Sequence, residues 1–219
     1  MYHTIFFDLG GTLVDSSEGV YRCFRYALEK MQAPPLPSHL EPLLIGPPLE
    51  DSFANFCGFS PEDSLRALDF FRERYRRVGY LEMSVVPGME EALSALRQVG
   101  LRLAVASSKE ERGCHMVLDA AGLSQYFELI AGHNVELANT KAAVIRSAMD
   151  RMGLTDGDAP GILMVGDRKY DAVGAAQWGI PCLGFDYCGF APAGELEEAG
   201  AIAVVHTAEE LTRFILERK

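Results

Sequence analysis

A short apolar run, a carboxylate and a glycine-rich turn follow one another in Ile5-Phe6-Phe7-Asp8-Leu9-Gly10-Gly11-Thr12-Leu13-Val14-Asp15-Ser16. The run at 4–7 predicts a buried strand that ends at Asp8. A carboxylate in this place can be an ordinary strand-end cap. The two glycines after it, however, give the turn a backbone that can adopt unusual dihedral angles and direct its N–H groups toward an anion. The stretch therefore indicates a strand with an anion site at its carboxyl end.

Short apolar runs bounded by turn residues alternate with helical patterns from residue 87 onward. The pattern predicts further buried strands at 101–106, 128–131, 162–165, 181–185 and 201–205. It predicts helices between and after them at 89–99, 110–121, 141–152, 171–178 and 208–217. Strand and helix in alternation indicate an α/β fold, a Rossmann-like parallel sheet with helices on both faces. The ligand site of such a sheet lies at the carboxyl ends of its strands.

The segment 16–86 interrupts this alternation. Amphipathic helices are expected at 18–31 and 61–78, separated by two proline-rich stretches, and no strand is expected in the segment. We interpret it as a small α-helical cap inserted after the first strand and its turn. The predicted domains are thus a core of residues 1–15 and 87–219 and a cap of residues 16–86.

Composition limits the possible partners and the compartment. A formal net charge of −11 argues against a nucleic-acid or anionic-membrane surface, because phosphate groups are held by clustered Lys and Arg. Five widely spaced cysteines without a Cys-x-x-Cys pair indicate neither a disulfide framework nor a zinc site. No apolar run is long enough to span a bilayer, and Asp8 interrupts the N-terminus before a signal-peptide core can form. We expect a cytoplasmic globular protein, a monomer or a homodimer, with neither nucleic acid nor membrane as partner.

Three further places hold residues suited to chemistry. Asp167 and Asp171 lie four residues apart, across a predicted strand end and helix start, and suit a hard divalent cation. Ser107 follows the strand at 101–106, and a lone serine there is most simply a helix N-cap. Lys141 lies in a first helical turn, where a positive charge opposes the helix dipole unless a negative group is near. By itself it would be a surface lysine.

Together these places resemble, in order, the motifs of the haloacid dehalogenase (HAD) superfamily. Its first motif is typically Asp-x-Asp-Gly-Thr-Leu-x-Asp-Ser, which the segment 8–16 matches except at Gly10. The stretch Ile45-Gly46-Pro47-Pro48-Leu49, with Ser52-Phe53 after it, is similar to the lid segment of the phosphoglycolate phosphatase-like branch. That branch hydrolyses small phosphomonoesters, including phosphoglycolate and 5'-nucleotides. The resemblance implies a Mg²⁺-dependent phosphatase with a small-molecule phosphomonoester as substrate.

The resemblance also implies a role for each motif residue. Asp8 would attack phosphorus in line and form an aspartyl-phosphate that water then cleaves. Ser107 and Lys141 would hold the phosphoryl oxygens where negative charge develops. The metal ligands are expected to be Asp8, the backbone carbonyl of Gly10 and Asp167, with Asp171 orienting them. The other substrate-binding residues are expected to be Gly11, Thr12, Ser108 and, in the cap, Arg72 and Arg76. The two arginines also fit the solvated face of an amphipathic helix.

Gly10 departs from the family pattern. The family has an aspartate there, which protonates the leaving alcohol and then activates the water. Losing a general acid–base costs about 10²–10⁴ in rate. Leaving groups of low pKa, such as an anomeric or aryl oxygen, would suffer least because they need least protonation. Asp15 and His133 are candidates to replace the lost group, although a turn-stabilising residue and an exposed loop side chain, respectively, are the simpler interpretations.

Other functions are also compatible with parts of this sequence. The dehalogenase branch also lacks the second aspartate but needs no cation, so the Asp167 and Asp171 pair argues against it. Phosphonoacetaldehyde hydrolase uses a cap lysine as a Schiff base, and Lys30, the single lysine of residues 16–86, lies far from the expected place. The chain could also be a catalytically weak or silent binder of phosphate ligands, or a module that regulates a partner.

Overall fold

The computed structural model describes residues 1–45, 49–134 and 140–218. It has a six-stranded sheet in the order β5-β4-β1-β6-β7-β8, and every neighbouring pair is parallel. The strands are β1 (Thr4–Phe7), β4 (Arg102–Glu110), β5 (Leu129–His133), β6 (Ile162–Gly166), β7 (Cys182–Phe185) and β8 (Ala203–Val205). The predicted α/β fold with a parallel sheet is confirmed, and the strands of the sheet are those that the apolar runs predict.

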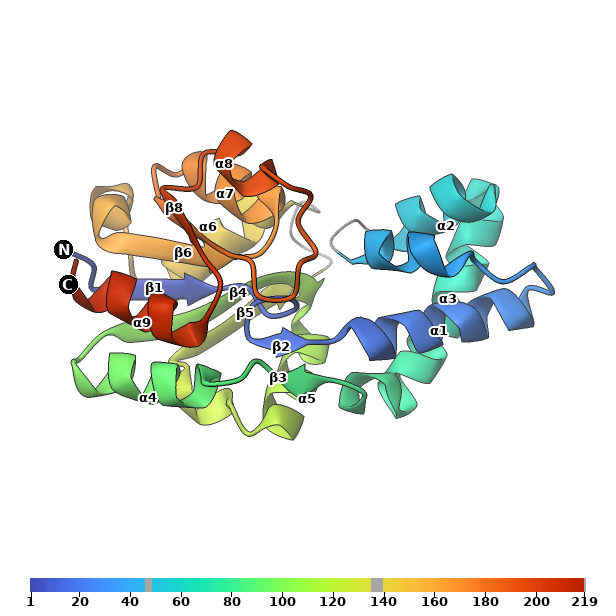
Figure 1. Ribbon diagram of the computed structural model, residues 1–219, viewed down its shortest axis with the longest axis horizontal. Helices are drawn as coiled ribbons and strands as arrows, with labels where there is room; N and C mark the ends of the chain where they lie inside the picture. The colour runs from blue at the N-terminus through green and yellow to red at the C-terminus, as the bar shows by residue number, and fades with distance from the viewer. Residues whose placement is uncertain (46–48, 135–139, 219) are drawn as a thin grey trace. The chain divides into compact units, whose positions relative to one another are not determined.

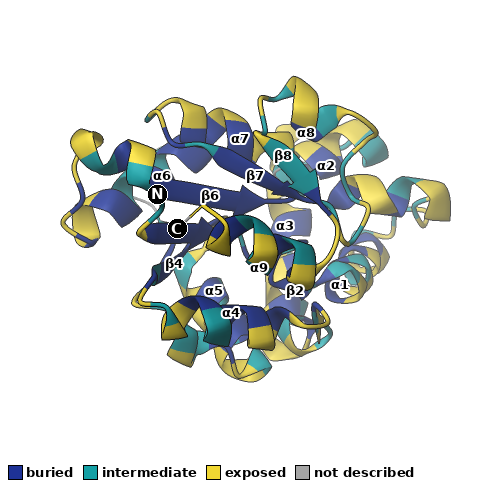
Figure 2. Cartoon of the chain, turned by 60° about the vertical axis from the view of Figure 1, so that its left-hand side comes forward, coloured by how far each residue is buried: buried dark blue, intermediate teal, exposed yellow. Residues whose placement is uncertain are grey.

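Helices cover both faces of the sheet, as Figure 1 shows. One face holds α6 (Lys141–Arg151) and α7 (Lys169–Ala176). The other holds α4 (Met89–Gln98), α5 (Glu111–Ala121) and α9 (Ala208–Leu216). A further short helix, α8 (Glu195–Glu198), precedes β8 and was not expected. The strands between these layers are buried along most of their length, which the dark ribbons of β6 and β7 make visible in Figure 2.

Successive residues of β1 point to opposite faces, as strand geometry requires. Phe6 packs in the cluster that α6 and α7 close, together with Ala104 and Ala106 of β4. Phe7 lies on the other face and meets Phe127 edge to face, with ring centroids 6.1 Å apart. Because both faces of β1 are buried, its residues from Ile5 to Phe7 are apolar, and the first charged residue, Asp8, follows directly after the strand ends.

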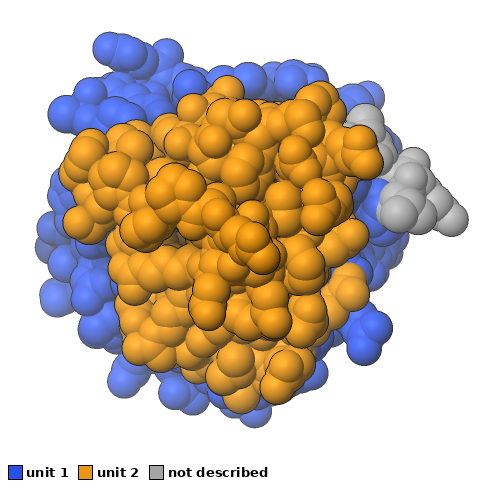
Figure 3. Space-filling view, turned by 90° about the vertical axis from the view of Figure 1, so that its right-hand side faces the viewer, with its two compact units in different colours: residues 1–15, 85–219 blue, residues 16–84 orange. Residues whose placement is uncertain are grey.

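The inserted segment forms a separate compact unit. The chain divides into one unit of Met1–Asp15 with Val85–Lys219 and a second of Ser16–Ser84, which are coloured separately in Figure 3. The second unit contains α1 (Ser17–Lys30), α2 (Leu49–Cys57) and α3 (Pro61–Arg77). Its core includes Phe24 of α1 stacked on Phe53 of α2, with ring centroids 4.2 Å apart. The unit ends two residues before the boundary that the sequence predicts.

Two elements near and within the cap contradict the expectations. The helix α2 lies between the two predicted cap helices, directly after the second proline-rich stretch, and proline directly before a helix is well tolerated. The strand β3 (Ser84–Val85) lies in a segment where no strand was expected and pairs with β2 (Val14–Asp15). Strands of two residues are too short to leave a periodic pattern. In the described part of the chain, no helix has the length and apolar character needed to cross a membrane.

Candidate active site

Asp8 lies where β1 ends, beside the end of β6. Phe7 is in register with Val165, and the N–H of Asp8 donates to the Val165 carbonyl at 2.9 Å. This register places Asp8 next to the residues that follow β6, and Asp167 is the first of them. Asp171 enters from the first turn of α7, and one carboxylate oxygen each of Asp8, Asp167 and Asp171 lie within 4.8 Å of one another. Three carboxylates thus meet at the carboxyl ends of two adjacent strands.

Lys141 is buried between two of these carboxylates. Its Nζ lies 2.5 Å from Oδ1 of Asp8 and 2.7 Å from Oδ1 of Asp171. Burial by itself lowers the pKa of this ammonium, but Asp171 and Asp8 outweigh it, so that the pKa is raised and the side chain stays charged. The two carboxylates also offset the unfavourable helix dipole at the start of α6. The interpretation of Lys141 as a surface lysine is therefore wrong.

The site has more negative charge than Lys141 alone neutralises. Asp167 is 3% exposed, and its Oδ2 is buried with no hydrogen-bond partner among the described residues. Burial raises the pKa of Asp167 well above its usual range, and Asp8 and Asp171 raise it further. Burial likewise raises the pKa of Asp171 to about 6, against the influence of Lys141. An orphaned buried oxygen among oxygen-only donors fits a hard divalent cation, which would remove this repulsion.

Gly11 makes room for Asp167. Its φ is +84°, and a Cβ placed on it would lie 2.0 Å from Oδ2 of Asp167. Its N–H donates to the carbonyl of Val14 at 2.8 Å, so in this conformation that N–H stabilises the turn and does not face an anion. Thr12 is fully buried and its hydroxyl donates to Oδ1 of Asp167 at 3.4 Å. The observed role of both residues is to shape the surroundings of Asp167.

We expect Gly11→Ala to destabilise the protein by more than the ordinary cost of a left-handed alanine, which is about 1–3 kcal/mol. The added methyl group must displace Asp167, so cation binding should be lost as well. Gly100→Ala is a matched control, because Gly100 has the same φ of +84° and no other atom lies within 4 Å of the place that its methyl group would take. The measurement is urea denaturation of both variants with and without Mg²⁺. Equal losses in both variants would show that Asp167 tolerates the methyl group.

Gly10 and Ser107 complete the predicted catalytic set. Gly10 is half-buried and its φ lies outside the left-handed region, so its backbone is open to a residue with a side chain. Ser107 lies within β4, which extends beyond the predicted strand, and it is buried with its Oγ accepting the N–H of Lys109 at 3.4 Å. β4 is the neighbour of β1 on the side away from β6, so Ser107 flanks Asp8 opposite Asp167. Ser108 follows it and is exposed.

Residues 5–185 match the protein family described as haloacid dehalogenase-like hydrolase. The chain belongs to this family. It is 36% identical to a 5'-nucleotidase of Pseudomonas aeruginosa, over 89% of this chain and 87% of that one. It is 32% identical to a phosphoglycolate phosphatase of Cupriavidus necator, over 96% and 92% of the two chains. The crystal structure of a predicted phosphatase from Clostridium acetobutylicum superposes with a TM-score of 0.90 at 35% identity, covering 99% of both chains.

These relatives confirm the predicted HAD-type hydrolase and its phosphoglycolate phosphatase-like branch. The four HAD motif regions all lie in the unit that contains the sheet, where the strand order β4-β1-β6 brings three of them side by side. The lid segment that resembles this branch falls partly on residues 46–48, which lie outside the described residues. The two predicted cap arginines, Arg72 and Arg76, are exposed on α3.

The two candidates for a replacement acid–base lie in different places. Asp15 belongs to β2, one residue after Val14, which forms a bridge with Gly10. His133 ends β5 and is not an exposed loop residue, because it is half-buried and its Nδ1 is buried without a partner among the described residues. β4 separates β5 from β1, and His133 is in register with Glu110, beyond the residues of β4 that pair with β1. Asp15 is the candidate closer to residue 10.

One pair near the site leaves no signal in the sequence. Arg168, which follows Asp167 directly, forms a salt bridge with Glu195 of α8 at 2.7 Å. The two residues are 27 positions apart, in segments without a shared pattern, so no local signal could have joined them.

Proposed function

We propose that this chain is a Mg²⁺-dependent phosphatase that hydrolyses a small phosphomonoester through an aspartyl-phosphate at Asp8. The proposal depends on one observation, the position of the Asp8 carboxylate beside a buried Lys141 and two buried carboxylates. A strand-end carboxylate next to a cation and a metal site is the arrangement that an attack on a phosphate dianion needs, since carboxylate and phosphate repel each other otherwise.

The chemistry proceeds in two displacements. An oxygen of Asp8 forms a bond to phosphorus while the bond to the leaving oxygen breaks and its electron pair goes to that oxygen. Water then attacks phosphorus, the bond to Asp8 breaks, and inorganic phosphate leaves with the carboxylate restored. Lys141 neutralises charge on Asp8 and the phosphoryl group, and Ser107 is placed to bind a phosphoryl oxygen. Held by Asp8, Asp167 and the carbonyl of Gly10, with Asp171 beside them, Mg²⁺ would supply Lewis-acid neutralisation of the phosphate.

The glycine at position 10 limits the substrates that this site can hydrolyse. Glycine has no side chain, so residue 10 cannot deliver a proton to the leaving oxygen. Phosphates with acidic leaving groups, such as aryl or anomeric oxygens, need little protonation and are therefore the substrates that the site should handle best. The names of the relatives point to phosphoglycolate and 5'-nucleotides, whose leaving groups are alkyl oxygens and would react more slowly here.

Turnover of p-nitrophenyl phosphate with Mg²⁺, measured beside a thermal shift with inorganic phosphate, tests the proposal. Turnover that requires Mg²⁺ supports a phosphatase. A thermal shift without turnover would identify the second candidate, a catalytically silent phosphate binder, which Gly10 specifically favours. A panel of phosphate esters, 2-haloacids and phosphonoacetaldehyde then separates the phosphatase from the two other hydrolases of this family. Release of halide or of acetaldehyde in place of phosphate from an ester would contradict the proposal.

We also propose that the cap arginines Arg72 and Arg76 read the part of the substrate beyond the phosphate. Both are exposed on α3, and guanidinium groups suit additional anionic groups. Replacing either by glutamine should raise KM for multiply charged phosphates several-fold and leave p-nitrophenyl phosphate nearly unchanged. Arg66→Gln is the control on the same helix, where Arg66 forms a salt bridge with Asp63 at 2.9 Å. Equal losses on both substrates would assign the arginines to folding.

A further inference from the structure

Arg168 and Glu195 form a forked ion pair directly beside Asp167. Nε of Arg168 donates to Oε1 of Glu195 at 2.7 Å, and Nη2 donates to Oε2 at 3.3 Å. The two side chains are only 12% and 9% exposed. Two parallel hydrogen bonds between a guanidinium and a carboxylate fix direction as well as distance. The side chain of the residue after Asp167 is therefore locked to α8.

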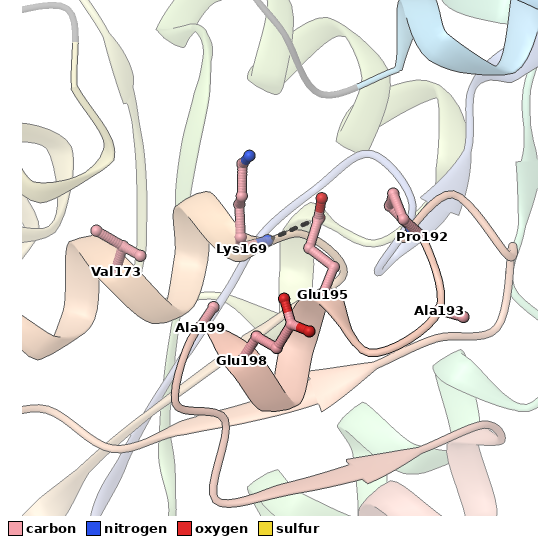
Figure 4. Close-up of a pocket in the computed structure, with 7 residues that line it drawn as sticks. All are labelled: Lys169, Val173, Pro192, Ala193, Glu195, Glu198 and Ala199. Carbon is pink, nitrogen blue, oxygen red and sulfur yellow. Dashed lines mark hydrogen bonds between the residues drawn. The ribbon is translucent and has the colours of Figure 1, made fainter.

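Glu195 also holds the backbone of the same segment. Its Oε1 accepts the N–H of Lys169 at 3.1 Å, the contact drawn as a dashed line in Figure 4. Lys169 is the first residue of α7, whose leading N–H groups have no partner within the helix. The N–H of Arg168 is bound in turn by Oδ2 of Asp171 at 3.1 Å. Two carboxylates thus hold the two consecutive N–H groups that follow Asp167.

The location of the pair argues for a role other than stability. Removing a guanidinium and a carboxylate from water costs free energy that their attraction only partly restores, so a buried ion pair is weak evidence for stabilisation. The pair does, however, fix the conformation of the backbone that follows Asp167. That matters here because the Asp167 carboxylate accepts one long hydrogen bond, from the Thr12 hydroxyl to Oδ1 at 3.4 Å, while its Oδ2 is buried with no partner among the described residues, so the neighbouring backbone also helps to determine where the carboxylate points.

We propose that Glu195 and Arg168 are positioning residues of the cation site, which hold the Asp167 carboxylate in the place where it binds a divalent cation. The inference rests on the proposed function in so far as Asp167 is a ligand of that cation. Partners that orient metal ligands typically affect metal affinity by 10–100-fold. Both residues are proposed to act through the segment that follows Asp167, so the effect should appear in cation affinity before it appears in the chemical step.

The test measures Mg²⁺ affinity by calorimetry on the protein without substrate. Glu195→Gln keeps the size of the side chain but loses the charged fork, and should weaken Mg²⁺ binding by about tenfold or more. Arg168→Lys keeps the charge but loses the fork, and should do the same. The double variant should be no worse than either single variant, because both remove one interaction. With p-nitrophenyl phosphate, kcat at saturating Mg²⁺ should stay within a few-fold of the parent.

Glu128→Gln is the matched control. Glu128 also accepts a fork, from Arg102 at 2.9 and 2.6 Å, but at the amino ends of the strands, far from Asp167. Unchanged Mg²⁺ affinity in Glu195→Gln, or an equal loss in Glu128→Gln, would overturn the inference. A parent protein that binds Mg²⁺ but hydrolyses no phosphate would overturn the proposed function alone. A parent that binds no Mg²⁺ would overturn both.

Discussion

Asp8→Asn is expected to lower turnover of p-nitrophenyl phosphate by on the order of 10⁴-fold or more, because removing a covalent nucleophile leaves only binding and electrostatic effects. The amide oxygen of asparagine can still accept from Lys141, so the site should remain assembled while losing its nucleophile. The measurement is kcat together with mass spectrometry of acid-quenched protein. The parent should show an added phosphoryl group on Asp8, and the variant should show none.

Asp119→Asn is the matched control, since Asp119 is an exposed residue of α5 that bonds Ser124 and has no place in the site. Its kcat should equal that of the parent.

Removal of divalent cations with EDTA should also abolish turnover, and added Mg²⁺ should restore it, because the carboxylates at the site repel a phosphate dianion without a cation. Phosphatase activity retained by Asp8→Asn would exclude the covalent mechanism.

Gly10→Asp is expected to speed the hydrolysis of alkyl phosphates by about 10²-fold or more, because it supplies a proton carrier two residues after the nucleophile. The φ of Gly10 lies outside the left-handed region, so an aspartate can adopt this φ without the backbone strain that the positive φ of Gly11 would impose on a side chain. The gain should be smaller for aryl phosphates, whose leaving groups depart without a proton. Mg²⁺ affinity should change little if the carbonyl of residue 10 is the ligand.

The measurement is kcat on one alkyl and one aryl phosphate for the parent and for Gly10→Asp. A phosphorylated Asp8 that accumulates in the parent should disappear in the variant, because water is then activated as well. Gly10→Asn is the matched control, since it adds the same bulk without a proton carrier and should leave the alkyl rate low. An alkyl rate that does not rise in Gly10→Asp would contradict the assignment of Gly10 as the defect. Loss of the parent's alkyl activity in Asp15→Asn would then identify Asp15 as the acid–base.

Local pattern was sufficient for the sheet and for all three carboxylate positions. Buried strands are short apolar runs between turn residues, and a carboxylate directly after such a run lies at the strand end whatever the rest of the chain does. The strand-end positions of Asp8 and Asp167 can therefore be predicted from the residues next to them in the chain. The position of Asp171 follows from its spacing of four residues after Asp167. The helix α2 was not predicted because the proline pair before it suggests a break in the chain, and the ribbon of β2 and β3 was not predicted because two-residue strands leave no alternating period.

The amino-acid sequence by itself determined the class of fold, the position of Asp8 at a strand end and the absence of a side chain at Gly10. Only the tertiary structure decided that Lys141 is a buried partner of two carboxylates, that Gly11 is small because Asp167 lies against it, and that Glu195 holds Arg168. The physical reason is the separation along the chain between the residues that interact. Strand and helix periods arise from neighbours in the chain, whereas the charge, burial and close contacts of a site depend on which strands lie side by side, and that order, β4-β1-β6, is set by packing of the whole sheet.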